Sequence, residues 1–265
     1  MIRRLALFLA SSAGLLSCTG LPPPDPIVSI DSGQVQGAVV DGVQAFRGIP
    51  FASPPTGAYR WRPPQPVAPW PGIRDARDYG PFCPQYPSPM LWFDLGPTDE
   101  DCLTLNVWAP AASTAQKRPV MVWIHGGGYV NGSGNIARLN SVAVAQQDVV
   151  LVTINYRLTL FGFMVHPYIV ASHPDEPAGN YGLMDVVAAL EWVRRNIAAF
   201  GGDPDNVTVF GESAGAGLVN FLMVMPSTEG LFHRAISQSS SVGMAPTPRI
   251  ERRVGFNAPA QDAGL

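Results

Sequence analysis

The sequence feature that most constrains this chain is the pentapeptide Gly-Glu-Ser-Ala-Gly at residues 211–215, because of the segments on either side of it. The preceding run, with Val207, Val209 and Phe210, is β-branched and aromatic, which is typical of a buried strand. The following run, residues 216–223, predicts a helix. The sequence therefore predicts a strand, a sharp turn and a helix, with Ser213 at the apex of the turn.

The two glycines of this pentapeptide favour a reactive serine. A Cβ at Gly211 or Gly215 would clash where the strand turns into a closely packed helix, and the turn pushes the Ser213 Oγ out above the edge of the sheet. The N-terminus of the helix then points backbone N–H groups at developing negative charge. The alternative is a serine in an ordinary glycine-rich turn, but the predicted strand and helix favour a nucleophile.

A second glycine-rich segment, H-G-G-G-Y at residues 125–129, directly follows an apolar run at residues 120–124 that predicts a central strand. Three glycines after a strand let the backbone approach a ligand and leave N–H groups unobstructed. In an acyl-transfer enzyme such a loop helps to form the oxyanion hole, which we assign to Gly127, Gly128 and Ala214. The alternative is a phosphate-binding glycine loop, but no Lys-Ser/Thr follows and the G-x-G-x-x-G spacing is absent.

The rest of the chain alternates predicted strands with predicted helices. This pattern favours the α/β class, with a mostly parallel central sheet and helices on both faces. An antiparallel hairpin is predicted at residues 27–40, and a long surface loop, rich in proline and aromatic residues, at residues 52–89. The predicted strands lie at residues 44–51, within 100–110, and at 120–124, 149–156 and 235–238, and the predicted helices at 136–147 and 183–200.

Residues 1–18 have the features of a processing signal and not of the fold. Two arginines precede an apolar run that ends in Leu-Leu-Ser-Cys, which resembles a bacterial lipobox and predicts lipidation of Cys18; ordinary signal cleavage is the alternative. Residues 19–26, with four prolines, suit an extended tether. We therefore expect an exported protein, lipid-anchored in the bacterial cell envelope or secreted, whose domain occupies residues 27–265.

Composition argues against several classes of partner. The formal net charge is −3 and no Lys/Arg cluster lies beyond the extreme N-terminus, which argues against nucleic acid. No apolar span of the mature chain is long enough to cross a bilayer, so membrane contact is expected only through the lipid anchor. No Cys-x-x-Cys spacing indicates a metal, and we expect neither metal nor cofactor. If Cys18 carries lipid, Cys83 and Cys102 remain, and export predicts that they form a disulfide.

Several separate segments, in the right order, resemble the type-B carboxylesterase family of α/β-hydrolases, the carboxylesterase and cholinesterase group. The stretch F-G-G-D-P-D-N-V-T-V-F-G-E-S-A-G from residue 200 looks like the active-site signature of that family, and E-D-C-L-T-L-N-V-W-A-P from residue 100 looks like its second signature. Segments at 46–57, 155–157, 179–185 and 230–239 are also similar, so the resemblance covers nearly everything after residue 27.

The resemblance implies an α/β-hydrolase fold and hydrolysis of a small-molecule carboxylic ester, with a soluble short- or medium-chain ester as the expected substrate. It also implies that Glu212 lies beside the nucleophile and tunes its electrostatics, and that Arg60 and Glu100 form an ion pair. The remaining residues that it implies are the nucleophile Ser213, the oxyanion hole at Gly127, Gly128 and Ala214, and a disulfide between Cys83 and Cys102.

The acid and the histidine of a catalytic triad are where the sequence departs from the family. Family members are about twice this length, and their acid and histidine follow the nucleophile. After Ser213 the only histidine is His233, in a segment that is a structural turn in the family; His125 opens the glycine loop, and His166 and His173 are expected in a loop. We therefore expect the N-terminal half of an ester hydrolase, with its later strands missing and an open sheet edge.

Two other functions stay open. One is a non-catalytic cholinesterase-like binding or adhesion domain; the intact Ser213 and glycine loop argue against it, because such domains usually lose the nucleophile. The other is a self-sufficient small lipoprotein hydrolase with an unorthodox base, which turnover of a chromogenic ester by the purified chain would support. The sequence does not indicate an oligomeric state.

Overall fold

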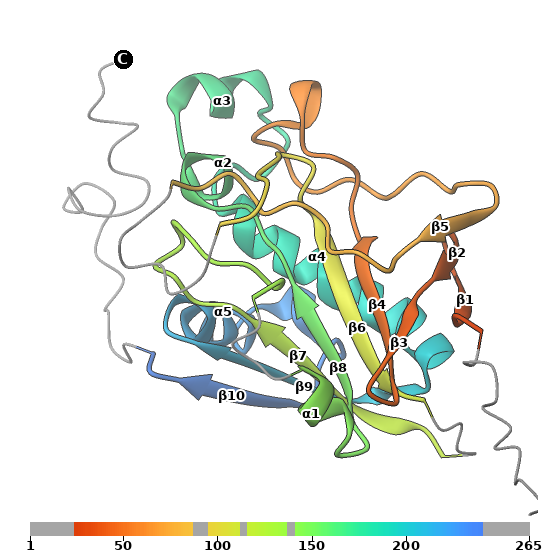
Figure 1. Ribbon diagram of the computed structural model, residues 1–265. Coiled ribbons are helices and arrows are strands. Elements are labelled where there is room, and N and C mark those ends of the chain that lie inside the picture. Colours follow the sequence, from red (N-terminus) through yellow and green to blue (C-terminus); the bar gives the residue numbers. More distant parts are fainter. Residues whose placement is uncertain (1–23, 87–94, 112–115, 137–140, 241–265) are drawn as a thin grey trace, which may run out of the picture.

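The computed structural model describes residues 24–86, 95–111, 116–136 and 141–240. Its dominant feature is a seven-stranded sheet in the order β10-β9-β7-β8-β6-β4-β3, and a separate three-stranded sheet has the order β1-β2-β5 (Figure 1). The predicted signal, the lipidation site Cys18 and residues 19–23 of the predicted tether lie outside the described residues.

The elements of the large sheet and of its connections follow the chain in this way. The strands of the large sheet are β3 (Ala38–Val40), β4 (Val43–Pro50), β6 (Thr104–Pro110), β7 (Arg118–Ile124), β8 (Val150–Ile154), β9 (Gly202–Glu212) and β10 (Arg234–Gln238). The α-helices are α1 (Ser141–Ala145), α2 (Thr159–Phe163), α3 (Pro167–Ser172), α4 (Tyr181–Asn196) and α5 (Ala214–Leu222), and the 3-10 helices are η1 (Gly57–Tyr59), η2 (Ile197–Phe200) and η3 (Pro226–Thr228).

The large sheet is mixed. Strands β8, β7, β9 and β10 are parallel to their neighbours in that order, and they form the half that carries the nucleophile turn. Strands β6, β4 and β3 pair antiparallel on the other side of β8. The sequence predicted a mostly parallel sheet, but only one half of the observed sheet is parallel. The other half is antiparallel and is formed by strands that come earlier in the chain.

Helices cover both faces of the large sheet, as predicted. Helices α4 and α5 pack on one face, where the core includes Val122 and Leu190. Helix α1 packs on the other face, where the core includes Leu151 and Trp108. Figure 1 shows α1 in front of the strands and α4 behind them. Strand β6 lies between β4 and β8 and contributes side chains to the cores on both faces. It is therefore buried from Thr104 to Ala109 and does not alternate between buried and exposed side chains.

The helix predicted over residues 183–200 is confirmed. Helix α4 begins two residues earlier, at Tyr181, and η2 completes the segment as a tighter helix. Of the apolar residues on its sheet-facing side, Val186, Leu190, Val193 and Ile197 are buried, and Leu183 and Val187 are partly buried against the core. Of the helix predicted over 136–147, the structure describes α1 from Ser141 to Ala145, and residues 137–140 lie outside the described part.

The hairpin predicted over residues 27–40 is present in its first part, whereas residues 38–40 form β3 of the large sheet, and one strand was missed beside the hairpin. Strands β1 (Ile27–Ile30) and β2 (Gly33–Gln36) pair antiparallel. Strand β5 (Ile73–Asp75), inside the segment predicted as loop, then pairs parallel with β2. Its three side chains are all exposed, so no apolar pattern marks it, and the pairing depends on contact with β2 alone.

The segment that contains His166 and His173 forms a short helix where a loop was predicted. Pro167 occupies the first turn of α3, where a missing N–H has no cost. The His166 side chain caps that turn by accepting a hydrogen bond from the Tyr168 N–H at 3.2 Å. The expected loop is therefore wrong for residues 167–172, because a proline in the first turn is compatible with a helix.

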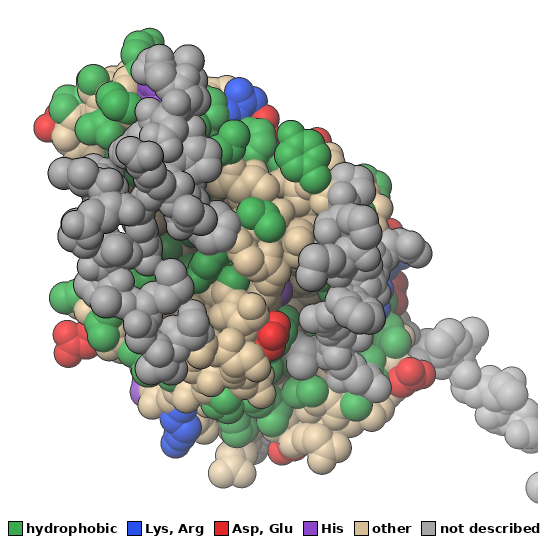
Figure 2. All heavy atoms as spheres, turned by 90° about the vertical axis from the view of Figure 1, so that its left-hand side faces the viewer, with side chains coloured by type: hydrophobic (Ala, Val, Ile, Leu, Met, Phe, Trp, Pro, Cys, Tyr) green, Lys and Arg blue, Asp and Glu red, His purple; other side chains and the backbone are tan. Residues whose placement is uncertain are grey.

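The edge of the large sheet at β10 carries exposed apolar side chains. Among the described residues β10 pairs with β9 only, and its Ile236 is exposed, as are Phe221 and Val224 at the end of α5. Figure 2 shows the side of the molecule on which α5 and β10 lie, with hydrophobic side chains at its surface. Within the described part of the chain, no helix combines the length and apolar character that a membrane span requires.

Candidate active site

The predicted nucleophile lies at the turn that joins β9 to α5. Ser213 has φ +54° and ψ −120°, a backbone conformation that L side chains rarely adopt. Its N–H donates to the carbonyl O of Gln238 on β10 at 2.9 Å, and its carbonyl O accepts from the N–H of Gly217 in α5 at 3.0 Å. The sheet and the helix therefore hold the serine in a strained conformation, as is common at functional sites.

The glycines on either side of Ser213 are required by close packing, as predicted. A Cβ at Gly211 would lie 2.6 Å from the carbonyl carbon of Gly215. A Cβ at Gly215 would lie 2.1 Å from the carbonyl O of Ile124, at the end of β7. Backbone atoms cannot be approached this closely by a side chain, so both positions need glycine.

The glycine loop that follows β7 lies directly against the nucleophile turn. A Cβ at Gly126 would lie 3.2 Å from the Cβ of Ser213 and 2.6 Å from the carbonyl O of Glu212. Gly127 and Gly128 have φ of +113° and +63°, where glycine is favoured. The structure thus brings together the serine and the loop that the sequence assigns to the oxyanion hole.

The N–H groups of Gly127, Gly128 and Ala214 donate no hydrogen bond to any other residue that the structure describes. The Gly127 carbonyl O, by contrast, accepts from the N–H groups of Val130 and Asn131 at 3.1 Å each. Backbone donors away from bulk water normally have a partner, and Ala214 also stands at the positive N-terminus of α5. Three unpaired donors around one serine suit an acceptor atom that carries negative charge.

Glu212 lies beside the nucleophile, as the family resemblance implies. It is the last residue of β9 and is half-buried. Its Oε2 is 2.8 Å from the position of a Cβ at Gly126, so the carboxylate lies against the glycine loop. A side chain at residue 126 would therefore contact Glu212 and Ser213 together, which explains the first glycine of the loop.

His125 opens the glycine loop, as predicted, and is buried. Its ring stacks on Tyr156 with centroids 4.3 Å apart, and its Nδ1 lies 2.8 Å from the carbonyl O of Gly126. Burial lowers the pKa of His125 to about 4, so the ring is neutral at neutral pH, and the nitrogen that faces the carbonyl carries the proton. The Tyr156 hydroxyl donates to the His125 carbonyl O at 2.9 Å, and burial raises the pKa of that hydroxyl.

The other histidines lie in three different places, and two of them bind backbone N–H groups. His233 accepts a hydrogen bond at Nδ1 from the Val207 N–H at 3.1 Å, just before β10 begins. Val207 lies six residues before Ser213 on β9, which is about 20 Å along an extended strand. His166 and His173 flank α3. No hydrogen bond joins the Ser213 hydroxyl to a histidine within the described residues.

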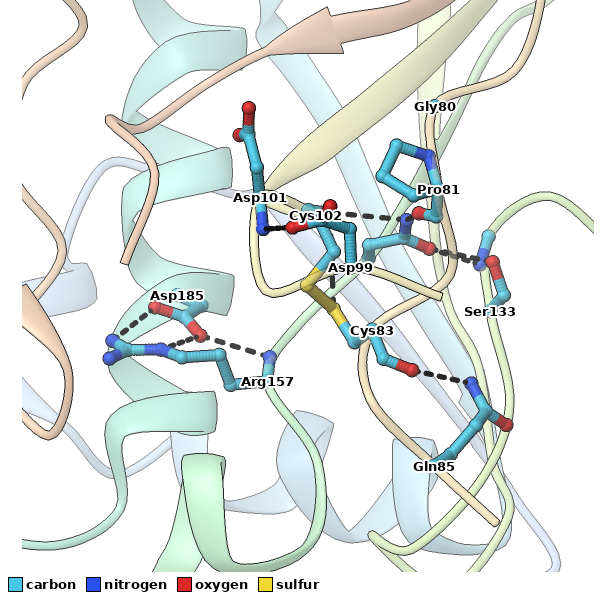
Figure 3. Close-up of a disulfide and its surroundings, with 12 residues drawn as sticks. Gly80, Pro81, Cys83, Gln85, Asp99, Asp101, Cys102, Ser133, Arg157 and Asp185 are labelled. Atoms are coloured by element: carbon cyan, nitrogen blue, oxygen red, sulfur yellow. Dashed lines mark hydrogen bonds and ion pairs between the residues drawn. A yellow bond between two sulfur atoms is a disulfide. The ribbon is translucent and has the colours of Figure 1, made fainter. Parts of the chain in front are cut away.

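The predicted disulfide and ion pair are both present. Cys83 and Cys102 are buried and bonded to each other, with their Cα atoms 5.0 Å apart (Figure 3). The bond joins the long segment before residue 86 to the residues that lead into β6. Arg60 donates to both carboxylate oxygens of Glu100, from Nε at 2.6 Å and from Nη2 at 2.5 Å.

Sequence reasoning missed a buried ion pair behind the site. Arg157 donates to the two carboxylate oxygens of Asp185 on α4, from Nε at 2.8 Å and from Nη2 at 2.7 Å (Figure 3). The two side chains are 3% and 0% exposed. Both residues lie in segments that resemble the family, but nothing in the sequence pairs them.

Sequence reasoning also missed two amide side chains, Gln85 and Asn155. Both bind backbone groups of residues 132–134, directly after the glycine loop. Asn155 lies in a segment that resembles the family, but nothing in the sequence indicates its contacts, and no charge, repeat or motif singles out Gln85. Among the described residues, no group of three or more His, Cys, Asp or Glu side chains could hold a metal ion.

A nucleophile turn after a central parallel strand, with a glycine loop at the end of the neighbouring strand, defines an α/β-hydrolase. The profile of the carboxylesterase family matches residues 24–260. The chain therefore belongs to the carboxylesterase family.

Comparison with individual proteins agrees with this assignment. The chain is 44% identical over 231 residues to the fumonisin B1 esterase of Sphingopyxis macrogoltabida, which is 85% of this chain and 43% of that protein. It is 46% identical over 219 residues to the para-nitrobenzyl esterase of Bacillus subtilis (strain 168), which is 81% of this chain and 44% of that protein.

A solved structure of a PNB esterase is also similar, with a TM-score of 0.74 at 46% identity over 82% of this chain and 44% of that one. The chain thus spans less than half the length of these relatives.

Proposed function

We propose that this chain provides the nucleophile and the oxyanion hole of a serine carboxylesterase that hydrolyses small-molecule carboxylic esters. The observation that carries the proposal is the strained Ser213, with a glycine loop packed against it and three backbone N–H groups that have no partner among the described residues. Membership of the carboxylesterase family, and the esterase names of the relatives, support ester chemistry.

In the proposed reaction a general base takes the proton of Ser213 Oγ, and the oxygen attacks the ester carbonyl carbon. The resulting oxyanion accepts hydrogen bonds from the N–H groups of Gly127, Gly128 and Ala214, each of which stabilises the transition state by about 3–4 kcal/mol. The protonated base then donates its proton to the leaving alcohol, and the acyl group stays on the serine. Water, deprotonated by the same base, releases the carboxylic acid and restores Ser213.

We assign an electrostatic role to Glu212. Its half-buried carboxylate lies against the glycine loop and next to Ser213 in the chain. A negative charge there favours the positive charge that a base acquires when it takes the serine proton. The residue acts on the base and not on the ester itself.

We propose that the general base is not one of the four histidines of this sequence. The sequence has four histidines, and all of them lie in the described part of the chain. His125, His166 and His233 bind backbone groups there, and His173 ends α3. We therefore infer that the complete enzyme supplies a histidine from elsewhere, which agrees with the share of the relatives that this chain spans.

We further propose that the protein is exported and attached to the cell envelope through a lipid on Cys18, with residues 1–18 as signal and 19–26 as tether. The supporting observations are the arginine pair, apolar run and Leu-Leu-Ser-Cys sequence at the N-terminus. A disulfide between Cys83 and Cys102 suits an oxidising compartment. Mass spectrometry of the protein from a bacterial membrane fraction tests this, because a diacylglyceryl mass on Cys18 is expected and an unmodified Cys18 contradicts it.

The ester proposal is tested with the chain alone and with the chain joined to the C-terminal part of the para-nitrobenzyl esterase. We expect the joined protein to hydrolyse para-nitrophenyl acetate and Ser213→Ala to lower its kcat by about 10⁴-fold or more. The control is Ser172→Ala, an exposed serine on α3 whose hydroxyl donates to the Tyr168 carbonyl; it should stay within about two-fold of the unmutated protein.

Two results would change this conclusion. Equal activity of the joined protein with and without Ser213 would show that the serine is not the nucleophile. Turnover by the chain alone, lost in Ser213→Ala, would show that the chain has a base of its own and is a self-sufficient hydrolase.

A further inference from the structure

The side chain of Gln85 binds both backbone groups of Gly132, in the segment that follows the glycine loop. Its Oε1 accepts from the Gly132 N–H at 2.9 Å, and its Nε2 donates to the Gly132 carbonyl O at 2.9 Å. The two residues are separated by 47 positions in the sequence. One amide side chain therefore satisfies both backbone groups of a single residue, which fixes the position of Gly132 in two directions.

Gly132 in turn lies against the first residues of the glycine loop. A Cβ at Gly132 would lie 2.3 Å from the Nδ1 of His125 and 2.4 Å from the carbonyl O of Gly126. Its φ of +116° also favours glycine. The backbone of Gly132 is thus in contact with the two atoms that form the His125–Gly126 hydrogen bond, and a shift of Gly132 would disturb that bond.

The His125–Gly126 hydrogen bond controls a donor of the oxyanion hole. The carbonyl O of Gly126 and the N–H of Gly127 belong to one planar peptide group and point in opposite directions. When His125 Nδ1–H holds that oxygen at 2.8 Å, the Gly127 N–H is directed to the other side of the peptide. Rotation of this peptide would turn the donor away from the place of the oxyanion.

The other contacts of Gln85 lead to the disulfide. Its Nε2 also donates to the carbonyl O of Cys83 at 3.1 Å (Figure 3). On the opposite side of the disulfide, Asn155 donates to the carbonyl O of Cys102 at 3.2 Å, and its Oδ1 accepts from the Gly134 N–H at 2.9 Å. Both ends of the disulfide are therefore joined by an amide side chain to the segment 132–134.

We propose that Gln85 is a positioning residue for the oxyanion hole: anchored at the disulfide, it holds Gly132 against the His125–Gly126 hydrogen bond and so keeps the Gly127 N–H in place. The proposal rests on the proposed function for its catalytic consequence. Its structural part, control of the glycine loop by Gln85, stands independently of any reaction.

Hydrogen exchange by mass spectrometry on the 265-residue chain tests the structural part. Gln85→Met keeps the length of the side chain and removes all three hydrogen bonds, whereas Gln85→Glu keeps an acceptor for the Gly132 N–H and loses the donor. We expect Gln85→Met to speed exchange at least about 10-fold in residues 125–135 and Gln85→Glu to give a smaller increase, with α4 unchanged in both. Gln146→Met is the matched control, because Gln146 donates to the distant Asp41 carbonyl O.

The catalytic part is measured on the protein joined to the C-terminal part of the para-nitrobenzyl esterase, as the rate at which a fluorophosphonate modifies Ser213, with the bound product located by peptide mapping. We expect Gln85→Met to lower the maximal rate by about 10- to 100-fold while the half-saturating concentration stays within two-fold, because the oxyanion forms only in the transition state. A residue that merely supports the fold would change both or neither.

Two results would overturn the proposal. One is unchanged exchange of residues 125–135 in Gln85→Met; the other is faster exchange in α4 as well, which would make Gln85 an ordinary stabilising residue. If the unmutated joined protein is not modified at Ser213, the proposed function fails, while the exchange data on the 265-residue chain still decide the role of Gln85.

Discussion

Replacing Ser213 with glycine should make the protein more stable while it removes the nucleophile. At φ +54° and ψ −120° the residue stands in a region that glycine occupies freely, and such strain costs about 1–3 kcal/mol for other residues. Glycine loses about 0.5–1 kcal/mol of this gain through the greater entropy of its unfolded state. The expected net increase in the free energy of unfolding is about 0.5–2 kcal/mol relative to the unmutated chain.

Ser213→Ala is the matched variant, because alanine keeps the Cβ and therefore the strain. The Ser213 side chain makes no capping hydrogen bond, so its loss should change the free energy of unfolding by less than about 0.5 kcal/mol. Urea unfolding, followed by circular dichroism, compares the unmutated 265-residue chain with Ser213→Gly and Ser213→Ala. The comparison requires that the three proteins have the same m-value, the slope of the free energy of unfolding against urea concentration.

A second control separates strain from the general effect of glycine. Ser172→Gly, in α3, should lower the free energy of unfolding by about 0.5–1 kcal/mol. If Ser213→Gly were less stable than Ser213→Ala by a similar amount, the turn would not be strained, and the argument that the fold stores strain at its nucleophile would be wrong.

Three further predictions concern the support of the site. Asp185→Asn should lower the free energy of unfolding by about 3–5 kcal/mol, because it leaves the buried Arg157 without its charge partner. The control Asp205→Asn, in an exposed ion pair, should lower it by less than about 1 kcal/mol, and urea unfolding measures both changes. Reduction of the disulfide should lower the free energy of unfolding by about 3 kcal/mol, measured as a fall in Tm.

The third concerns His125, whose pKa burial lowers from 6.5 to about 4: the unfolded chain binds a proton in this range that the folded chain does not, so stability falls as pH drops through it. His125→Phe, which can still stack on Tyr156, should remove that part of the pH dependence in acid-unfolding curves; an unchanged curve would contradict it.

The nucleophile turn could be predicted from the sequence because its constraints are local. The residues that force the turn, Gly211 and Gly215, are neighbours of Ser213, and the strand and helix that confirm it are contiguous with it. The same holds for the glycine loop, which directly follows β7. Where a few adjacent residues between a clearly predicted strand and a clearly predicted helix determine the site, the sequence pattern is sufficient to predict that site.

The elements that were missed depend on distant contacts. Strand β5 is three exposed residues long and exists only through its pairing with β2. The Arg157–Asp185 pair joins residues 28 positions apart, and Gln85 reaches across 47 positions to Gly132. A lone glutamine in an irregular segment has no periodicity or charge to mark it, so its role follows from the tertiary structure alone.

Among the described residues the large sheet has a free edge at β10, and the proposed general base would be placed beside that edge. Phe221, Met223 and Val224 at the end of α5, and Ile236 on β10, are 55%, 53%, 77% and 43% exposed. A further strand parallel to β10 would end at the edge where Ser213 stands, because the carboxyl ends of parallel strands meet at one edge of a sheet. The loop after such a strand is where an acid or a histidine can reach the serine, and the helix after that loop would cover the exposed apolar side chains. In the proposed complete enzyme, the strand, loop and helix that bring the base to Ser213 would therefore also cover the exposed apolar side chains.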